Sequence, residues 1–167
     1  MANWLSILST LLAVGSDVAT PTFRVRVGDR ASAGAVEAAL TGASRRLTRP
    51  GCARVFRDFS DRTGHALQQN LDTLGHDGPA YLRLVVFADG TGHRSCRGGG
   101  GPLAVTAPGA RVVFVCPRFR AAQWQKPDFA EAVLIHETLH TLGLPENPPS
   151  SDAITKRVLA RCGTGER

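Results

Sequence analysis

Apolar and polar residues follow one another along the chain with two different periods, and each period predicts one kind of element. Alternation at every second position, or a short apolar run bounded by turn residues, predicts a β-strand. Four segments fit this description: 22–27 (TFRVRV), 53–59 (ARVFRDF), 81–88 (YLRLVVFA) and 111–115 (RVVFV). Helical spacing of apolar residues, with flanking cap and stop residues, predicts helices. These are expected at 33–47, 66–74, 127–142 and 152–161.

The order of these elements indicates the fold class. In the helix over 33–47, Val36, Ala39, Leu40 and Leu47 form the expected buried stripe. The main sequence of elements is strand, helix, three strands, helix and a helical tail, without an internal repeat in the 167 residues. We therefore predict an α+β fold in which two principal helices pack against a mixed sheet. Residues 16–167 are expected to form one domain.

The N-terminal segment has the composition of a secretion signal. Residues 4–14 (WLSILSTLLAV) are apolar over the length of a signal-peptide core and too short to span a bilayer. Ala13 and Gly15, at the end of this segment, have the small size that a cleavage site requires. Residues 1–15 are therefore expected to be a signal peptide cleaved after Gly15. The alternative is a buried N-terminal helix. No transmembrane segment is expected.

Four cysteines bear on the compartment. Cys52, Cys96, Cys116 and Cys162 are widely spaced and form no CxxC pair, which argues against a cysteine-ligated zinc site. An even number at such spacing is typical of two disulfides in an oxidising compartment. A secreted or periplasmic protein is therefore expected. Three pairings are possible, and four buried thiols in a reducing compartment remain the alternative.

The net charge of +6 raises the question of an acidic partner. Most basic residues are arginines, with Lys126 and Lys156 the only lysines, and they are spread from Arg24 to Arg167. A nucleic-acid surface would gather them in a dense run with interleaved aromatics. We predict a solvated basic surface and no nucleic-acid partner.

The segment HETLHTLGLPE, residues 136–146, carries the candidate chemistry. Residues four apart lie on one face of a helix, so His136 and His140 can bind one zinc ion at about 2.0–2.1 Å. Glu137 is rotated by about 100° from the first ligand and is placed to act as a general base. The opposite face is apolar and is expected to pack in the core; it carries Ala132, Ile135, Leu139 and Leu142.

The pattern HExxHxxGxxE resembles the zinc signature of the metzincin-like metallopeptidases, a group of zincins. The resemblance implies that His136 and His140 are zinc ligands and Glu137 the base. It further implies that Gly143 forms a sharp turn and Glu146 is the third ligand. It also implies a zincin-like mixed sheet with a back helix and an active-site helix. The segment 81–89 would be the sheet edge along which an extended substrate binds. The tail after Glu146 is similar to that of small bacterial metallopeptidases.

Two features depart from the metzincin pattern. Metzincins usually have a histidine where Glu146 stands, and they carry a methionine turn beneath the metal, whereas this chain has only Met1. Asp152 is an alternative third ligand, although an acid in the first turn of a helix is also favoured by the helix dipole. The chain is thus similar to metzincins without matching every family feature.

From these residues we expect a zinc-dependent metallopeptidase that acts on a peptide or protein substrate. Glu137 would take a proton from a zinc-bound water and return it to the leaving amine. The alternative is a zinc-binding envelope or secreted protein without catalytic activity. Three further histidines lie in polar loops and are expected to be exposed, with the alternative that one of them helps to polarise a substrate carbonyl: His65, His76 and His93.

Overall fold

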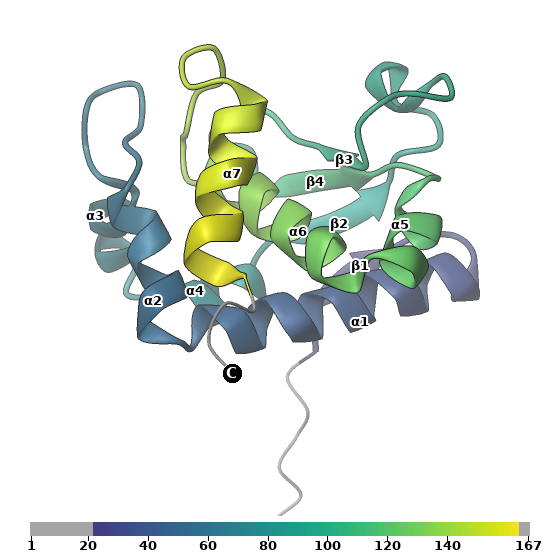
Figure 1. Cartoon of the computed structure of the whole chain (residues 1–167), viewed down its shortest axis with the longest axis horizontal. Helices are drawn as coiled ribbons and strands as arrows, with labels where there is room; N and C mark the ends of the chain where they lie inside the picture. The colour runs from purple at the N-terminus through teal and green to yellow at the C-terminus, as the bar shows by residue number, and fades with distance from the viewer. Residues whose placement is uncertain (1–21, 164–167) are drawn as a thin grey trace, which may run out of the picture.

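A computed structural model of the chain describes residues 22–163, so the expected signal peptide over 1–15 lies outside the described residues. The fold is α+β, as predicted, with helices α1, α5 and α6 covering one face of a small sheet (Figure 1). The strands are β1 (Arg24–Arg26), β2 (Val86–Asp89), β3 (Ala104–Val105) and β4 (Val112–Val115). The α-helices are α1 (Arg30–Leu47), α2 (Pro50–Ala53), α3 (Leu67–Thr73), α4 (Gly78–Leu82), α5 (Phe119–Gln125), α6 (Pro127–Thr141) and α7 (Ser151–Cys162). Two 3-10 helices are η1 (Arg54–Arg57) and η2 (Arg94–Cys96).

The sheet is mixed, with the order β1-β2-β4-β3. The first three strands in this order are parallel, and β3 runs antiparallel to β4 at one edge. Val25, Phe87 and Val113 are in register across the parallel strands. Phe87 and Val113 are fully buried, and Val25 packs against the same core. One face of the sheet thus forms a continuous apolar surface for the helices.

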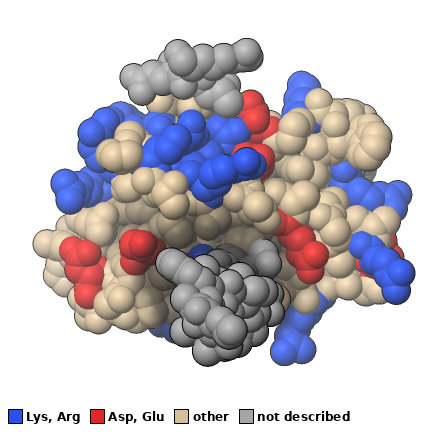
Figure 2. Space-filling model, turned by 90° about the horizontal axis from the view of Figure 1, so that it is seen from below, with Lys and Arg blue, Asp and Glu red and all other residues tan. Residues whose placement is uncertain are grey.

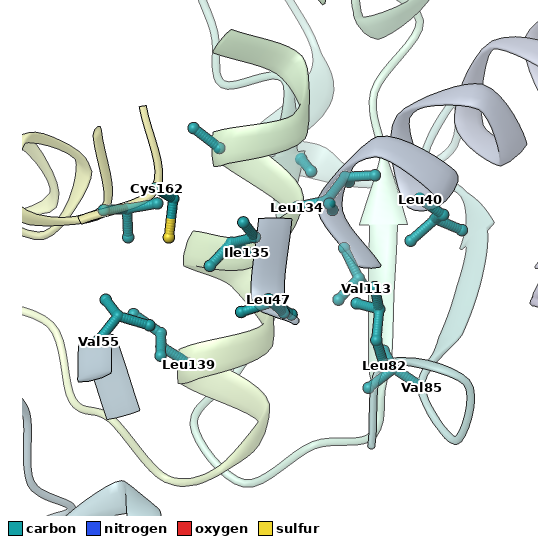
Figure 3. Close-up of a cluster of buried hydrophobic side chains, with 14 of the residues drawn as sticks. Leu40, Leu47, Val55, Leu82, Val85, Val113, Leu134, Ile135, Leu139 and Cys162 are labelled. Carbon is teal, nitrogen blue, oxygen red and sulfur yellow. The ribbon is translucent and has the colours of Figure 1, made fainter. Parts of the chain in front are cut away.

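Helices α1 and α6 fill the core beneath the sheet. Asp29 caps α1 by accepting a hydrogen bond from the Ser32 backbone N–H at 2.8 Å. The predicted stripe of α1 is confirmed, because Val36, Ala39, Leu40 and Leu47 are all buried. Figure 3 shows Leu40 and Leu47 in one cluster with Val113 of β4 and three side chains of α6, namely Leu134, Ile135 and Leu139.

Two of the predicted strands are wrong in whole or in part. Residues 53–57 form the end of α2 and the 3-10 helix η1, where the consecutive residues Val55 and Phe56 are both buried, and residues 58–59 follow outside any helix or strand. Consecutive burial suits a helical turn and not an alternating strand. Residues 78–82 form α4, which Asp77 caps by accepting the Ala80 N–H at 2.7 Å. Only 86–89 of that region is a strand.

Two disulfides settle the pairing that the spacing left open. Cys52 is bonded to Cys162, which ties α2 to the end of α7, and Cys96 to Cys116, which ties η2 to the end of β4. No cysteine of the described chain is free. Two disulfides are compatible with an extracellular protein. Within residues 22–163, no helix combines the length and apolarity needed to cross a membrane.

A buried arginine joins the three helices around the core. Arg46 of α1 donates from Nε to Glu131 of α6, and from its terminal nitrogens to Asp128 and to the Cys162 carbonyl, both at 2.6 Å. Gly42 leaves room for this contact, since a Cβ there would collide with the Glu131 carboxylate. The network fixes α6 and the end of α7 on α1.

Figure 2 shows the largest group of basic side chains at the upper left of the face seen from below, with others at its right and lower edges. Arg49, Arg54 and Arg161 line a shallow depression between α2 and the end of α7. Arg161 is paired with Asp58 and Arg49 with the Cys162 carbonyl. Part of the positive charge therefore stabilises the fold.

Candidate metal centre

Helix α6 carries the polar residues of the site into the protein interior. It begins with Pro127, whose fixed φ suits the first turn, and it ends at Thr141. Ile135 and Leu139 are fully buried on its core side. His136, Glu137 and His140 are also buried, with 5%, 7% and 3% of their surfaces exposed. The predicted burial of the apolar face is confirmed; the polar side is buried as well and lines a groove.

The two imidazole rings face each other. The Nε2 atoms of His136 and His140 lie 3.0 Å apart. Two nitrogens bound tetrahedrally to one zinc at about 2.0–2.1 Å would be separated by roughly 3.3–3.4 Å, slightly more than the distance found here. The ring geometry therefore fits two ligands of a single ion.

The other nitrogen of each ring is held by a partner. His136 Nδ1 lies 2.9 Å from Thr155 Oγ1 of α7, and His140 Nδ1 lies 2.8 Å from the Leu144 carbonyl oxygen. Metal-ligating histidines are usually oriented in this way, through a hydrogen bond at the nitrogen that does not bind the ion. Both partners were missed at the sequence level, because one is a backbone atom and the other depends on the docking of α7.

The chain turns sharply after α6, as the glycine predicted. Gly143 has a φ of 107°, a left-handed conformation that favours glycine. A Cβ at this position would also lie 3.1 Å from the Asp61 Cβ. Asn70 Nδ2 donates to the Leu142 carbonyl and to the Asp61 carboxylate, both at 3.0 Å. These contacts fix the turn that leads from His140 to Glu146.

The structure does not bring a third ligand to the histidine pair. Within residues 22–163, no group of three His, Cys, Asp or Glu side chains is placed to hold a metal ion. Glu146 is exposed but lines the same groove as His136 and His140. The Asp152 side chain is 73% exposed, pairs with Lys156 at 2.7 Å and does not line the groove. Glu146 therefore stays a prediction, and Asp152 has the surroundings of a helix-terminal acid.

Burial sets the charge state of the site. Burial and, to a smaller extent, the Glu146 carboxylate together raise the pKa of Glu137 to about 8, against a lowering by the Thr106 backbone. Burial also lowers the pKa of His136 to about 4, with a smaller contribution from His140. The neutral imidazole of His136 is the form that binds a metal. A cation at the two Nε2 atoms would favour the ionised form of Glu137.

The groove of about 510 Å³ extends from these residues around the edge strand β3. Its walls include Val105 of β3, Thr106 directly after it, and Val112 and Phe114 of β4. His93 also lines it, half-buried and stacked on Phe114 with ring centroids 4.9 Å apart. His93 is thus not exposed to solvent as predicted.

The predicted substrate edge at 81–89 is wrong. Tyr81 and Leu82 are helical, and β2 lies between β1 and β4 in the interior of the sheet. The edge beside the groove is β3, which is only two residues long and follows a glycine-rich loop. The Gly109 N–H donates to the His140 carbonyl at 2.9 Å and so holds the β3–β4 hairpin over α6.

Comparison with protein-family models, with curated proteins and with solved structures gave no match to this chain. Function is therefore inferred from the geometry of the groove and of its three central residues.

Proposed function

We propose that the chain is a zinc-dependent metallopeptidase with His136 and His140 as ligands and Glu137 as general base. The observation that carries this proposal is the 3.0 Å separation of the two Nε2 atoms, with both Nδ1 atoms already hydrogen-bonded. Glu137 is the third buried polar group beside them.

The residues of the chain have distinct roles in this proposal. A zinc ion, when bound, supplies Lewis acidity that activates water and polarises a carbonyl. Glu137 accepts a proton from the attacking water at its carboxylate and returns it to the nitrogen of the leaving amine. Burial keeps this carboxylate away from bulk water, which strengthens its interactions with charged groups in the groove.

Glu146 is the third ligand in this proposal. It lines the groove on the loop after the Gly143 turn and offers the oxygen donors that zinc accepts. The turn itself is fixed by Asn70 and Asp61, so the loop leaves α6 in one direction. The position of Asp152 outside the groove supports this choice.

The substrate in this proposal is an extended peptide. Within residues 22–163, β3 is paired with β4 alone, and in this proposal the peptide adds a strand at the other edge of β3. Val105, Val112 and Phe114 give the groove apolar walls. These walls favour a peptide with an apolar side chain near the scissile bond. Two disulfides support a secreted or periplasmic location.

The test uses Glu137→Gln, with Glu37→Gln on the exposed side of α1 as the matched control. Zinc content by mass spectrometry and cleavage of a peptide library are measured for the wild type and both variants. We expect one zinc per chain in all three, chelator-sensitive cleavage in the wild type and control, and a loss of about 100-fold or more in Glu137→Gln. Undiminished cleavage by Glu137→Gln would refute the base. Zinc without cleavage in the wild type would favour the non-catalytic zinc-binding protein.

A further inference from the structure

The two histidines of the site are held by partners of different chemistry. The Leu144 carbonyl can only accept a hydrogen bond, so His140 Nδ1 carries a hydrogen. In the neutral ring this leaves a bare lone pair on His140 Nε2. The Thr155 hydroxyl beside His136 Nδ1 can either donate or accept. His140 is therefore fixed in one tautomer, whereas His136 is free to adopt two.

The contact between the rings determines which tautomer His136 adopts without a metal. At 3.0 Å, two facing lone pairs would repel, so one Nε2 must carry a hydrogen and donate it to the other. His140 cannot be the donor, because its single hydrogen is on Nδ1. His136 Nε2 is then the donor, and its bare Nδ1 accepts from the Thr155 hydroxyl.

We propose that Thr155 is a positioning residue for His136 and that its hydrogen bond reverses direction when a metal binds. When both Nε2 atoms serve as ligands, the hydrogen of His136 must be on Nδ1. The proton on Nε2 passes to solvent, and the ring takes up a proton from solvent at Nδ1. The ring therefore stays neutral, and no net proton is released. The Thr155 hydroxyl then accepts from Nδ1 in place of donating to it. The metal-bound half of this inference rests on the proposed zinc site.

The fold places the Thr155 hydroxyl independently of any ion. Ile154 and Val158 of α7 are fully buried on either side of it. The end of α7 is fixed by the disulfide from Cys162 to Cys52 and by Arg46, which donates to the Cys162 carbonyl. The hydroxyl therefore stays in contact with His136 through a change of tautomer.

The test compares Thr155→Val, which keeps the shape and removes the hydroxyl, with Thr155→Ser, which keeps the hydroxyl. Thr41→Val, at an exposed position within α1, is the control for the Thr→Val change. Ring tautomers are assigned by long-range ¹H–¹⁵N spectra at pH 8, where an ordinary histidine is neutral. Zinc dissociation constants are measured by competition with a chromophoric chelator, and thermal unfolding confirms that each variant is folded.

In the metal-free wild type we expect His136 with its hydrogen on Nε2 and His140 with its hydrogen on Nδ1. After zinc addition both hydrogens should be on Nδ1. The zinc dissociation constant should rise by about 10-fold or more in Thr155→Val and stay near the wild-type value in Thr155→Ser and Thr41→Val. A metal-free His136 with its hydrogen on Nδ1, or an unchanged constant in folded Thr155→Val, would overturn the inference. A wild type that binds no zinc would overturn the metal-bound half and the proposed function together, while the metal-free tautomers still test the other half.

Discussion

The two disulfides close loops of very different length, and this difference sets their expected contributions to stability. Cys52–Cys162 spans 110 residues and Cys96–Cys116 spans 20. In the chain-entropy model, closing these loops lowers the entropy of the unfolded chain by about 16 and 11 cal/mol/K. This corresponds to a stabilisation of the folded state by about 4.8 and 3.3 kcal/mol at 25 °C. Replacing both cysteines of a pair by alanine removes two largely buried sulfurs in either case. The loss of packing is therefore similar. We expect removal of the disulfide that closes the longer loop to lower the free energy of unfolding by about 1.5 kcal/mol more.

The assay is equilibrium unfolding in urea at 25 °C and neutral pH, with a chelator present so that metal binding does not add to stability. Each double-alanine variant is the control for the other. The midpoint should fall further for the Cys52/Cys162 variant than for the Cys96/Cys116 variant. Equal midpoints, or the reverse order, would show that loop length does not govern the stabilisation in this fold.

Two further perturbations test the contacts that fix α6 and α7. Glu131→Ala leaves the buried Arg46 guanidinium without its Nε partner and should lower the free energy of unfolding by about 3 kcal/mol in urea titrations, whereas Glu131→Gln should cost less. Hydrogen bonds from Arg161 lower the pKa of Asp58. The ionised carboxylate therefore stabilises the folded protein at pH values above the ordinary carboxyl pKa, and this contribution is lost as pH falls through the lowered pKa. Asp58→Asn should therefore lower the urea midpoint at pH 7, with a difference from wild type that shrinks toward zero in acid; a constant difference would contradict this.

The elements that were predictable are those whose pattern is local and long. The apolar spacing predicted helix α1 with a start three residues after the observed one. Helix α6 was placed by Pro127 at its beginning and Gly143 after its end. Strand β4 was found because RVVFV is a short apolar run bounded by turn residues. In each case the signal is contained in the element itself.

The errors occurred where a short apolar run suits a helix and a strand equally well. YLRLVVFA was assigned to one strand, although its first residues complete α4 and only its end enters β2. Asp77 and Pro79 supply the cap and first turn of α4, but they also suit a loop. Segment 53–59 alternates like a strand, yet it contains η1, whose Val55 and Phe56 are both buried in the core formed with distant parts of the chain. Local pattern alone does not decide such cases.

The candidate site also has one part that local sequence predicts and one part that it does not. The relation of His136, Glu137 and His140 follows from the pitch of one helix, so spacing alone placed the two Nε2 atoms on one side. Thr155 and the Leu144 carbonyl complete the hydrogen bonding of these rings, yet neither has a recognisable signal in the sequence. Strand β3 escaped notice because two residues carry no period. Local geometry thus located the chemistry, and tertiary packing supplied its supports.

The position of these polar groups is itself an argument for chemistry. Burying an acid whose neutral form is favoured, beside a histidine whose charged form is disfavoured, stabilises a fold less than apolar side chains would. The same helix shows that polar groups can be fully satisfied when they serve structure: Thr141 accepts from Tyr81 at 3.0 Å and donates to the Thr138 carbonyl at 2.7 Å. His136 and His140 also have a partner at every ring nitrogen, but their shared contact lies at the wall of an open groove. Perturbed pKa values gathered at one groove are typical of functional sites, and this supports the proposed role of the three residues.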